Sequence, residues 1–212
     1  MEDLASIRKD YTQRSLREQD VSPDPLDQFS AWFKEAVNAG VNEPNAMHLA
    51  TATPEGRPSG RVVLLKGLEN GGFSFYTNFQ SHKGKELEAN PYCCLTFFWP
   101  ELERQVRIEG QASRLADEIA DTYYNSRPLA SRIGAWASPQ SAVIGSREIL
   151  EQRFKELEQK FAAAEPARPR QWGGFSVKPN LIEFWQGRPG RLHDRLQYTL
   201  NESGWQLHRL AP

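Results

Sequence analysis

The sequence predicts a single α+β domain, mainly antiparallel β, with a barrel or sandwich at its centre. Five short strand-like runs, separated by turns rich in Gly, Pro and Asn, follow one another between residues 46 and 115. Segments with helical spacing of apolar residues flank this region. With 212 residues and 39% hydrophobic content, the chain is long enough to bury one large core, and no internal repeat divides it.

The N-terminal segment, residues 1–22, is polar and contains only scattered apolar positions. We therefore expect a mobile arm over 1–22, which becomes ordered only against another surface, followed by a single domain over 23–212. Arg8 and Tyr11 lie three positions apart, so they share one face if the arm is helical.

Helices and strands are expected in the following order along the domain. The first helix begins at Asp24, a good N-cap residue followed by proline, and ends at Gly40. The strand-like runs are 46–52, 60–68, 72–78, 93–99 and 104–115. Further helices are expected at 81–89, 117–126 and 146–163, and two closing strands at 174–186 and 191–210.

Charge and cysteine content narrow the class of protein. The 26 basic and 27 acidic side chains give a net charge of −1, which argues against a nucleic-acid or anionic-membrane surface. Residues 1–14 lack the apolar core of a signal peptide, and no stretch approaches the roughly 18 apolar residues of a membrane span. Cys93 and Cys94 are adjacent and would point to opposite faces of a strand, so they are not expected to pair. We expect a cytoplasmic protein in a reducing environment.

Several common ligand motifs are absent from the sequence. It contains neither G-x-x-x-x-G-K-[ST] nor G-x-G-x-x-G, so any phosphate must be held by side chains. The four histidines are scattered, no H-E-x-x-H motif occurs, and no metal site is expected. What remains is a set of basic and hydroxyl side chains inside apolar segments, which is costly unless an anion or a carboxylate meets each charge.

The segment "RLHDR" concentrates these charges most strongly. If residues 191–195 are extended, Arg191, His193 and Arg195 share one face, where they would repel one another unless something negative or electron-rich lies over them. The alternative is an edge strand whose charges prevent aggregation.

Two further basic segments could hold anions. In "RVVLLK", a regular strand would aim Arg61 and Lys66 at opposite faces, unless Lys66 lies beyond the strand end; both could also be ordinary strand-end residues. In "YTNFQSHKGKEL", Lys83 lies at the start of a helix, where free N–H groups and the helix dipole favour a phosphate. Ser81 could instead be a simple N-cap, with Lys83 in solvent.

A phosphate and a planar ring would account for the polar residues of three other segments. Residues 123–141 contain arginines, tyrosines and serines with almost no acidic residue, which favours a second phosphate site. Gln105 could hydrogen-bond a planar heterocycle. Trp185 could form a wall of the same pocket, although a lone tryptophan is more often part of a core or an interface.

Taken together, eight segments in order resemble the pyridoxine (pyridoxamine) 5'-phosphate oxidase family. They are "RVVLLK", "FYTN" with "SHKGKEL", "LERQVRIEG", "SRPLASRIGAWASPQS", "WGGF", "IEFWQG", "RLHDR" and the terminal "RLAP". The resemblance extends from about Ile7 to Pro212. It implies an FMN-binding split β-barrel, a Greek-key barrel with flanking helices, that works as a homodimer with FMN at the subunit interface.

The resemblance also implies roles for individual residues. FMN-contacting positions are Arg61, Val62, Lys66, Tyr76, Thr77, His82, Lys83, Gln105, Gln140, Ser141, Trp185 and Arg195. Positions that bind the substrate phosphate are Lys66, Tyr123, Arg127 and Ser131. Arg191 and His193 would lie beside the pyridine ring as the catalytic pair, and Arg8 and Tyr11 would cover the bound substrate. At position 82 the family commonly has arginine, so His82 is a departure from the family's pattern.

The activity implied is oxidation of pyridoxine or pyridoxamine 5'-phosphate to pyridoxal 5'-phosphate, with O2 as acceptor and H2O2 as product. A related branch of the family serves phenazine biosynthesis, but the intact "SRPLASRIGAWASPQS" favours the vitamin B6 enzyme. A non-catalytic flavin or pyridoxal-phosphate carrier would need the FMN residues without the substrate set. A nucleic-acid-binding barrel would use aromatic and basic residues on strands, but the near-neutral charge opposes it.

Overall fold

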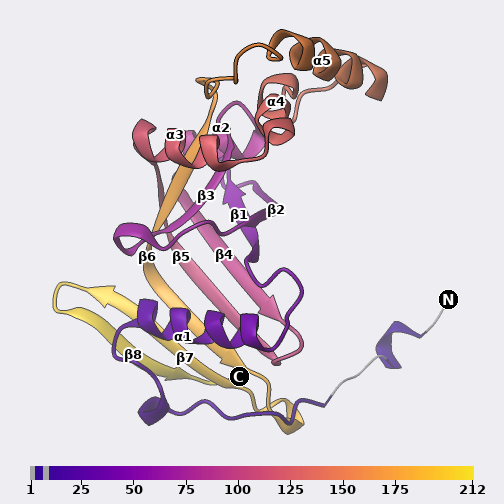
Figure 1. Ribbon diagram of the computed structural model, residues 1–212. Helices are drawn as coiled ribbons and strands as arrows, with labels where there is room; N and C mark the ends of the chain where they lie inside the picture. The colour runs from indigo at the N-terminus through magenta and orange to yellow at the C-terminus, as the bar shows by residue number, and fades with distance from the viewer. Residues whose placement is uncertain (1–2, 7–9) are drawn as a thin grey trace.

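One antiparallel sheet forms the body of the protein in the computed structural model, which describes residues 3–6 and 10–212. The strands are β1 (Ala46–Ala52), β2 (Pro58–Leu64), β3 (Phe73–Asn78), β4 (Tyr92–Trp99), β5 (Arg104–Arg114), β6 (Trp172–Gln186), β7 (Asp194–Asn201) and β8 (Gly204–Leu210). They pair in the order β2-β1-β4-β5-β6-β7-β8, and β3 pairs with β6 outside this path. The sheet curves but does not close, which is the geometry of a split barrel (Figure 1).

Five α-helices and four short 3-10 helices accompany the sheet in the described residues. The α-helices are α1 (Pro25–Asn38), α2 (His82–Ala89), α3 (Asp117–Ser126), α4 (Leu129–Ala137) and α5 (Arg147–Lys160). The 3-10 helices are η1 (Leu4–Ser6), η2 (Glu18–Asp20), η3 (Glu69–Gly71) and η4 (Pro189–Arg191). None of the helices in the described residues is both long and apolar enough to cross a membrane.

Helix α1 covers one face of the sheet and completes the core beneath it (Figure 1). It begins as the sequence predicts, because the Asp24 side chain accepts a hydrogen bond from the Leu26 N–H at 2.8 Å and proline occupies the first helical position. Phe29 is fully buried, and its ring lies 4.9 Å from that of Phe73 and 5.0 Å from that of Phe97. Truncating such a side chain to alanine costs about 3–5 kcal/mol of stability.

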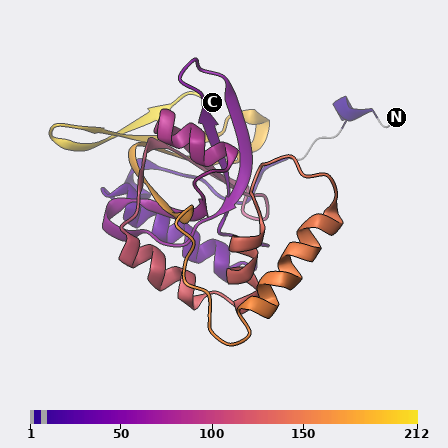
Figure 2. The same ribbon diagram turned by 90° about the horizontal axis from the view of Figure 1, so that it is seen from above.

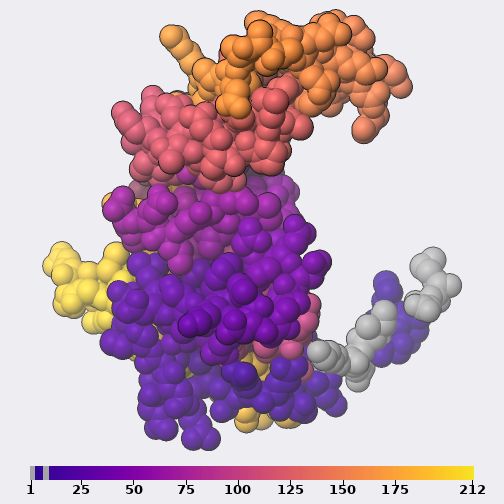
Figure 3. Space-filling model, in the orientation of Figure 1, coloured from indigo at the N-terminus to yellow at the C-terminus, as the bar shows by residue number. Residues whose placement is uncertain are grey.

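Helices α3, α4 and α5 lie beyond one end of the sheet (Figure 1), and the view from above shows α4 between α3 and α5 (Figure 2). Helix α5 has no buried residue, and it lies on the outside of the molecule next to α4 (Figure 3). Helix α4 was not expected from the sequence, whereas α3 and α5 were, close to their observed limits.

One closing strand was expected over 191–210. The structure has a 3-10 helix where that strand was expected to begin, and a two-stranded hairpin over the rest. Residues Pro189–Arg191 form η4, where Gly190 and Arg191 both have positive φ, +64° and +60°. Regular strand geometry begins only at Asp194, so Arg191, His193 and Arg195 do not share one strand face. The remainder is a hairpin of β7 and β8 rather than one strand.

Candidate functional site

A cavity of about 670 Å³ opens where β2 and β3 meet helices α2, α3 and α4. It brings together ten of the residues predicted from the sequence to bind cofactor or substrate. These are Arg61, Val62, Lys66, Tyr76, Thr77, Lys83, Tyr123, Arg127, Ser131 and Gln140. They come from segments up to 79 positions apart, so the fold, and not local spacing, gathers them.

Arg61 and Lys66 both line this cavity, and of the two arrangements that the sequence left open, the one with Lys66 beyond the end of the strand is confirmed. Strand β2 ends at Leu64, and Lys66 lies beyond it, where its backbone N–H donates to the Ser74 carbonyl at 2.8 Å. Lys66 therefore lines the same cavity as Arg61 although it lies outside the regular strand.

The cavity is strongly cationic. Among the described residues that line it, four are cationic (Arg61, Lys66, Lys83 and Arg127) and none is Asp or Glu. Burial lowers the pKa of Lys83, and the positive charge of Arg61 lowers it further. One terminal nitrogen of Arg127, Nη1, is buried without a hydrogen-bond partner among the described residues. A buried guanidinium N–H without a partner is costly, so this cavity fits an anionic ligand.

Three aromatic rings form a stacked wall of the same cavity. The ring of Tyr76 lies 3.8 Å from that of Tyr123, and 5.5 Å from that of Trp172. The guanidinium of Arg127 lies over Trp172 at 4.7 Å. Sequence reasoning gave Trp172 no role. The glycine two positions later was a signal, because a Cβ at Gly174 would lie 2.9 Å from the Tyr76 ring.

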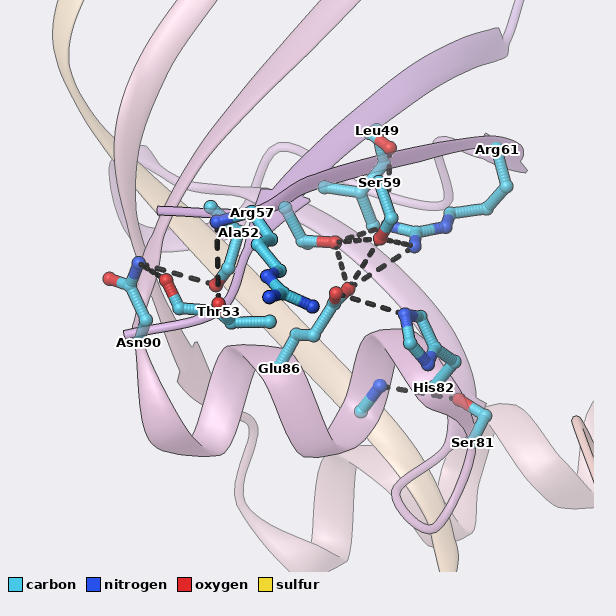
Figure 4. A network of polar contacts seen from close by, with 12 residues as sticks. Leu49, Ala52, Thr53, Arg57, Ser59, Arg61, Ser81, His82, Glu86 and Asn90 are labelled. Atoms are coloured by element: carbon cyan, nitrogen blue, oxygen red, sulfur yellow. Dashed lines mark hydrogen bonds and ion pairs between the residues drawn. The ribbon is translucent and has the colours of Figure 1, made fainter. Parts of the chain in front are cut away.

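The buried carboxylate of Glu86 anchors Arg61 at the cavity wall (Figure 4). Glu86 is 6% exposed, and its Oε2 accepts hydrogen bonds from Thr51 at 2.5 Å and Ser59 at 2.6 Å, with Arg61 Nη2 at 3.3 Å. Burial raises the pKa of Glu86, but these hydrogen bonds and the adjacent His82 and Arg61 together hold it below its ordinary value. The carboxylate therefore stays charged and keeps the arginine oriented.

His82 and Ser141, two further predicted cofactor residues, line a neighbouring cavity of about 390 Å³. His82 lies 3.0 Å from Glu86 through Nε2 (Figure 4). Gln140 lines both cavities, and its side-chain oxygen accepts hydrogen bonds from Thr77 at 3.1 Å and from the Asn78 N–H at 3.3 Å. The Gln140 side chain, held by these two hydrogen bonds, therefore borders both cavities.

A second group of predicted residues gathers around Trp185. Its ring lies 4.7 Å from the His193 ring and 5.6 Å from the Tyr11 ring, which contacts it edge-on. The backbone N–H of Arg188 donates to His193 Nδ1 at 3.1 Å, which fixes the imidazole. Arg191 follows in η4 with its left-handed backbone. Arg8 lies outside the described residues.

Gln105, Trp185 and Arg195 form one cross-strand row over β5, β6 and β7. Arg195 is held there by Glu183, which is 2% exposed and accepts from Arg195 Nε at 2.7 Å and from Arg107 Nη2 at 2.6 Å. Burial raises the pKa of Glu183, but the hydrogen bonds from both arginines outweigh burial and lower it.

The two groups lie towards opposite ends of β6 (Figure 1). Thirteen positions separate Trp172 in the cavity wall from Trp185, which corresponds to roughly 40 Å along the strand. One copy of the chain therefore presents the predicted residues as two separate half-sites. In the described part of the chain, no three His, Cys, Asp or Glu residues are grouped as metal ligands.

Comparison with known proteins assigns the chain to a family. Residues 33–161 match the family model for pyridoxamine 5'-phosphate oxidase, and residues 172–212 match the pyridoxine 5'-phosphate oxidase C-terminal dimerisation region. The pyridoxine/pyridoxamine 5'-phosphate oxidase of Cyanothece sp. is 54% identical over 209 residues, which cover 99% of this chain and 98% of that protein.

Two solved structures are similar to this one. PhzG from Burkholderia lata, in complex with tetrahydrophenazine-1-carboxylic acid, is 31% identical with a TM-score of 0.89, covering 95% of this chain and 99% of PhzG. A pyridoxamine 5'-phosphate oxidase-related, FMN-binding protein from Nostoc punctiforme is 18% identical with a TM-score of 0.71, covering 91% of this chain and all of that one. The second likeness concerns the fold alone.

The open barrel and these comparisons define a split-barrel oxidoreductase of the FMN-binding type. The chain belongs to the pyridoxamine 5'-phosphate oxidase family.

Proposed function

We propose that this protein is an FMN-dependent oxidase that converts pyridoxine or pyridoxamine 5'-phosphate to pyridoxal 5'-phosphate, with O2 as electron acceptor and H2O2 as product. One observation carries the proposal: the cation-lined cavity contains the predicted phosphate-binding residues, and none of the described residues that line it is a carboxylate. Two phosphorylated ligands would supply the negative charge that these cations require. Full-length relatives with the corresponding name support the same substrates and a role in vitamin B6 metabolism.

The complete site is formed by two copies of the chain. The residues grouped around Trp185 lie within 172–212, except for Gln105 and Tyr11. The segment 172–212 matches a dimerisation region. A two-fold axis places the same surface of each copy against the other, so the cavity of one copy can meet the Trp185 group of its partner. FMN then lies at the subunit interface, between the cavity residues of one copy and Gln105, Trp185 and Arg195 of the other.

Each half-site has a distinct task in the reaction. Bound FMN supplies the two-electron chemistry. Lys66, Tyr123, Arg127 and Ser131 hold the substrate phosphate, and Arg191 and His193 fix the pyridine ring from the opposite end. Arg191 contributes position and charge, since arginine does not release its proton. Holding the ring at both ends lowers the barrier by removing freedom of motion, an effect of up to about 7–11 kcal/mol in well-aligned cases.

The chain acts as one domain over 23–212 with an arm over 1–22 that covers the substrate through Arg8 and Tyr11. We place the enzyme in the cytoplasm. The two free thiols, Cys93 and Cys94, suit a reducing compartment.

Phenazine oxidation is the second candidate, because PhzG is similar along nearly its whole length. The ligand in the PhzG structure is a carboxylic acid without phosphate. Four cations in one cavity exceed what a single carboxylate needs, which favours phosphorylated ligands.

The direct test is to purify the protein, record its visible spectrum and add pyridoxine 5'-phosphate in air. We expect a yellow flavoprotein and equal formation of H2O2 and aldehyde. A colourless protein that takes up no FMN would refute the proposed function. A flavoprotein that oxidises a reduced phenazine carboxylic acid and ignores pyridoxine 5'-phosphate would support the second candidate.

A further inference from the structure

The turn between β4 and β5 carries a buried glutamate that contacts the N-terminal arm. Glu103 is 2% exposed. Its Oε2 accepts hydrogen bonds from two successive backbone N–H groups of the arm, Thr12 at 2.9 Å and Gln13 at 3.2 Å. A charged acceptor strengthens both hydrogen bonds, so this carboxylate fixes the direction of the backbone at these two residues.

The residue that these hydrogen bonds place is Tyr11, which directly precedes Thr12. The Tyr11 ring lies edge-on to Trp185 at 5.6 Å and to His193 at 5.8 Å. It also packs directly on Gly187, where an added Cβ would lie 2.6 Å from Tyr11 Cγ. The close fit means that a small shift of the arm backbone would remove the ring from this position.

Glu103 also contacts the end of β6, the strand that carries Trp185. Its carbonyl oxygen accepts hydrogen bonds from the Gly187 N–H at 2.8 Å and from Gln186 Nε2 at 3.2 Å. Its φ is +54°, a left-handed conformation that is unfavourable for glutamate. A non-glycine residue persists in such a conformation where surrounding contacts require it, and these sites are often functional.

The rest of the arm has its own attachments. The Leu16 side chain is buried, and its N–H donates to Asp194 Oδ2 at 3.0 Å. Arg209 Nη2 donates to the Leu16 carbonyl at 2.9 Å. Loss of the Glu103 carboxylate should therefore release the segment around Tyr11 and leave the segment around Leu16 in place.

We propose that Glu103 is a positioning residue that holds Tyr11 over the Trp185–His193 pair and so closes the substrate site. This inference rests on the proposed function, in which Tyr11 covers the bound substrate. Glu103 acts through the arm and does not touch the reacting atoms. Its loss should weaken substrate binding more than it slows the chemical step.

The experiment compares Glu103→Ala and Glu103→Gln with Glu101→Gln in the full-length holoprotein. Glu101 is an exposed residue of the same turn whose backbone carbonyl, and not its side chain, accepts from Gln13. Hydrogen exchange of individual amides is the first measurement. We expect Thr12 and Gln13 to exchange about tenfold faster in Glu103→Ala, with Leu16 unchanged and the Glu101 variant like the wild type.

Steady-state kinetics with pyridoxine 5'-phosphate is the second measurement. We expect KM to rise severalfold in Glu103→Ala while kcat and FMN content change little. In the double variant with Tyr11→Ala, the Glu103→Ala change should cause no further rise in KM, because both changes act through the Tyr11 ring. Glu103→Gln, which keeps an acceptor oxygen but loses the charge, should fall between the wild type and Glu103→Ala.

Unchanged exchange at Thr12 and Gln13, or additive kinetic effects in the double variant, would overturn the inference while the proposed function stands. If the wild type does not oxidise pyridoxine 5'-phosphate, the proposed function fails. The role of Glu103 in substrate closure then fails with it, and the exchange result shows separately whether Glu103 holds the arm.

Discussion

At the scale of single residues, two buried carboxylates each orient one arginine of the proposed site. Glu86 holds Arg61 at the cavity, and Glu183 holds Arg195 in the second half-site. An arginine beside a fixed carboxylate has its planar head oriented before any ligand arrives, which reduces the entropy lost on binding. Each glutamate is therefore a structural requirement of the half-site in which it lies.

The low pKa of Glu183 leads to a prediction about stability and pH. Because the folded-state pKa lies below the unfolded value of 4.5, Glu183 stabilises the fold above that value, and the contribution is lost as pH falls through the folded-state pKa. Glu183→Gln should lower the free energy of unfolding by about 3 kcal/mol near neutral pH. The difference from wild type should shrink in denaturant titrations carried out at progressively lower pH. The exposed Glu88→Gln is the control, and a difference independent of pH would contradict the argument.

Arg191 supports a prediction about turnover. In the proposed site Arg191 lies beside the substrate ring and is not one of the residues proposed to hold FMN, so Arg191→Ala should lower kcat/KM strongly and leave FMN content near wild type. Flavin absorbance per protein and peroxide formation measure the two quantities on one sample. Parallel loss of both would refute this role.

At the scale of elements, the sequence predicted those helices and strands whose start and spacing are set by residues within the element itself. Helix α1 was predicted because Asp24, Pro25 and the apolar spacing all lie within it. Helix α4 was missed because its N-cap is Pro128, which provides no side-chain hydrogen bond. The strand predicted to begin at residue 191 was wrong at its start, because Pro189 and Gly190 begin a 3-10 helix that includes Arg191.

The candidate site was predictable as a set of residues but not as an arrangement. The cations and their motifs are visible in the sequence, whereas no neighbouring sequence pattern identifies Glu86 and Glu183 as their partners. The pairing of β3 with β6, about 100 positions away, builds the cavity wall, and no spacing rule anticipates it. The division into two half-sites follows from the length of β6.

Helix α2 provides a prediction at this scale because it carries Lys83, which donates to Thr77 of β3 at 3.3 Å, and Glu86, which accepts from Thr51 of β1 and Ser59 of β2. Its first turn is capped by Ser81, whose Oγ accepts from the Gly84 N–H at 3.3 Å. Ser81→Ala should destabilise the protein by about 1 kcal/mol and weaken FMN binding by loosening the turn that carries Lys83. Ser30→Ala, on the exposed side of α1, is the control in urea titrations and FMN titrations. Unchanged FMN affinity in Ser81→Ala would mean that the cap serves stability alone.

At the scale of the whole molecule, one face of the sheet exposes two large apolar side chains. Val62 is 67% exposed and Phe98 is 54% exposed. Phe98 is the cross-strand neighbour of Gln105, which in turn pairs with Trp185, so this face is continuous with the second half-site. Val62 also lines the cavity, so this face reaches both half-sites. Contact between two such faces would bury the apolar side chains and join the half-sites in one step.

This arrangement predicts that dimerisation and FMN binding are lost together. Phe98→Arg places a charge in the centre of the proposed contact, and we expect a shift from dimer to monomer in sedimentation velocity together with lower FMN occupancy. Val37→Arg is the matched control, because Val37 is 51% exposed but lies on α1, which covers the other face of the sheet. A Phe98→Arg protein that remains dimeric would place the interface elsewhere. A monomer with full FMN occupancy would show that one copy of the chain suffices to hold the cofactor.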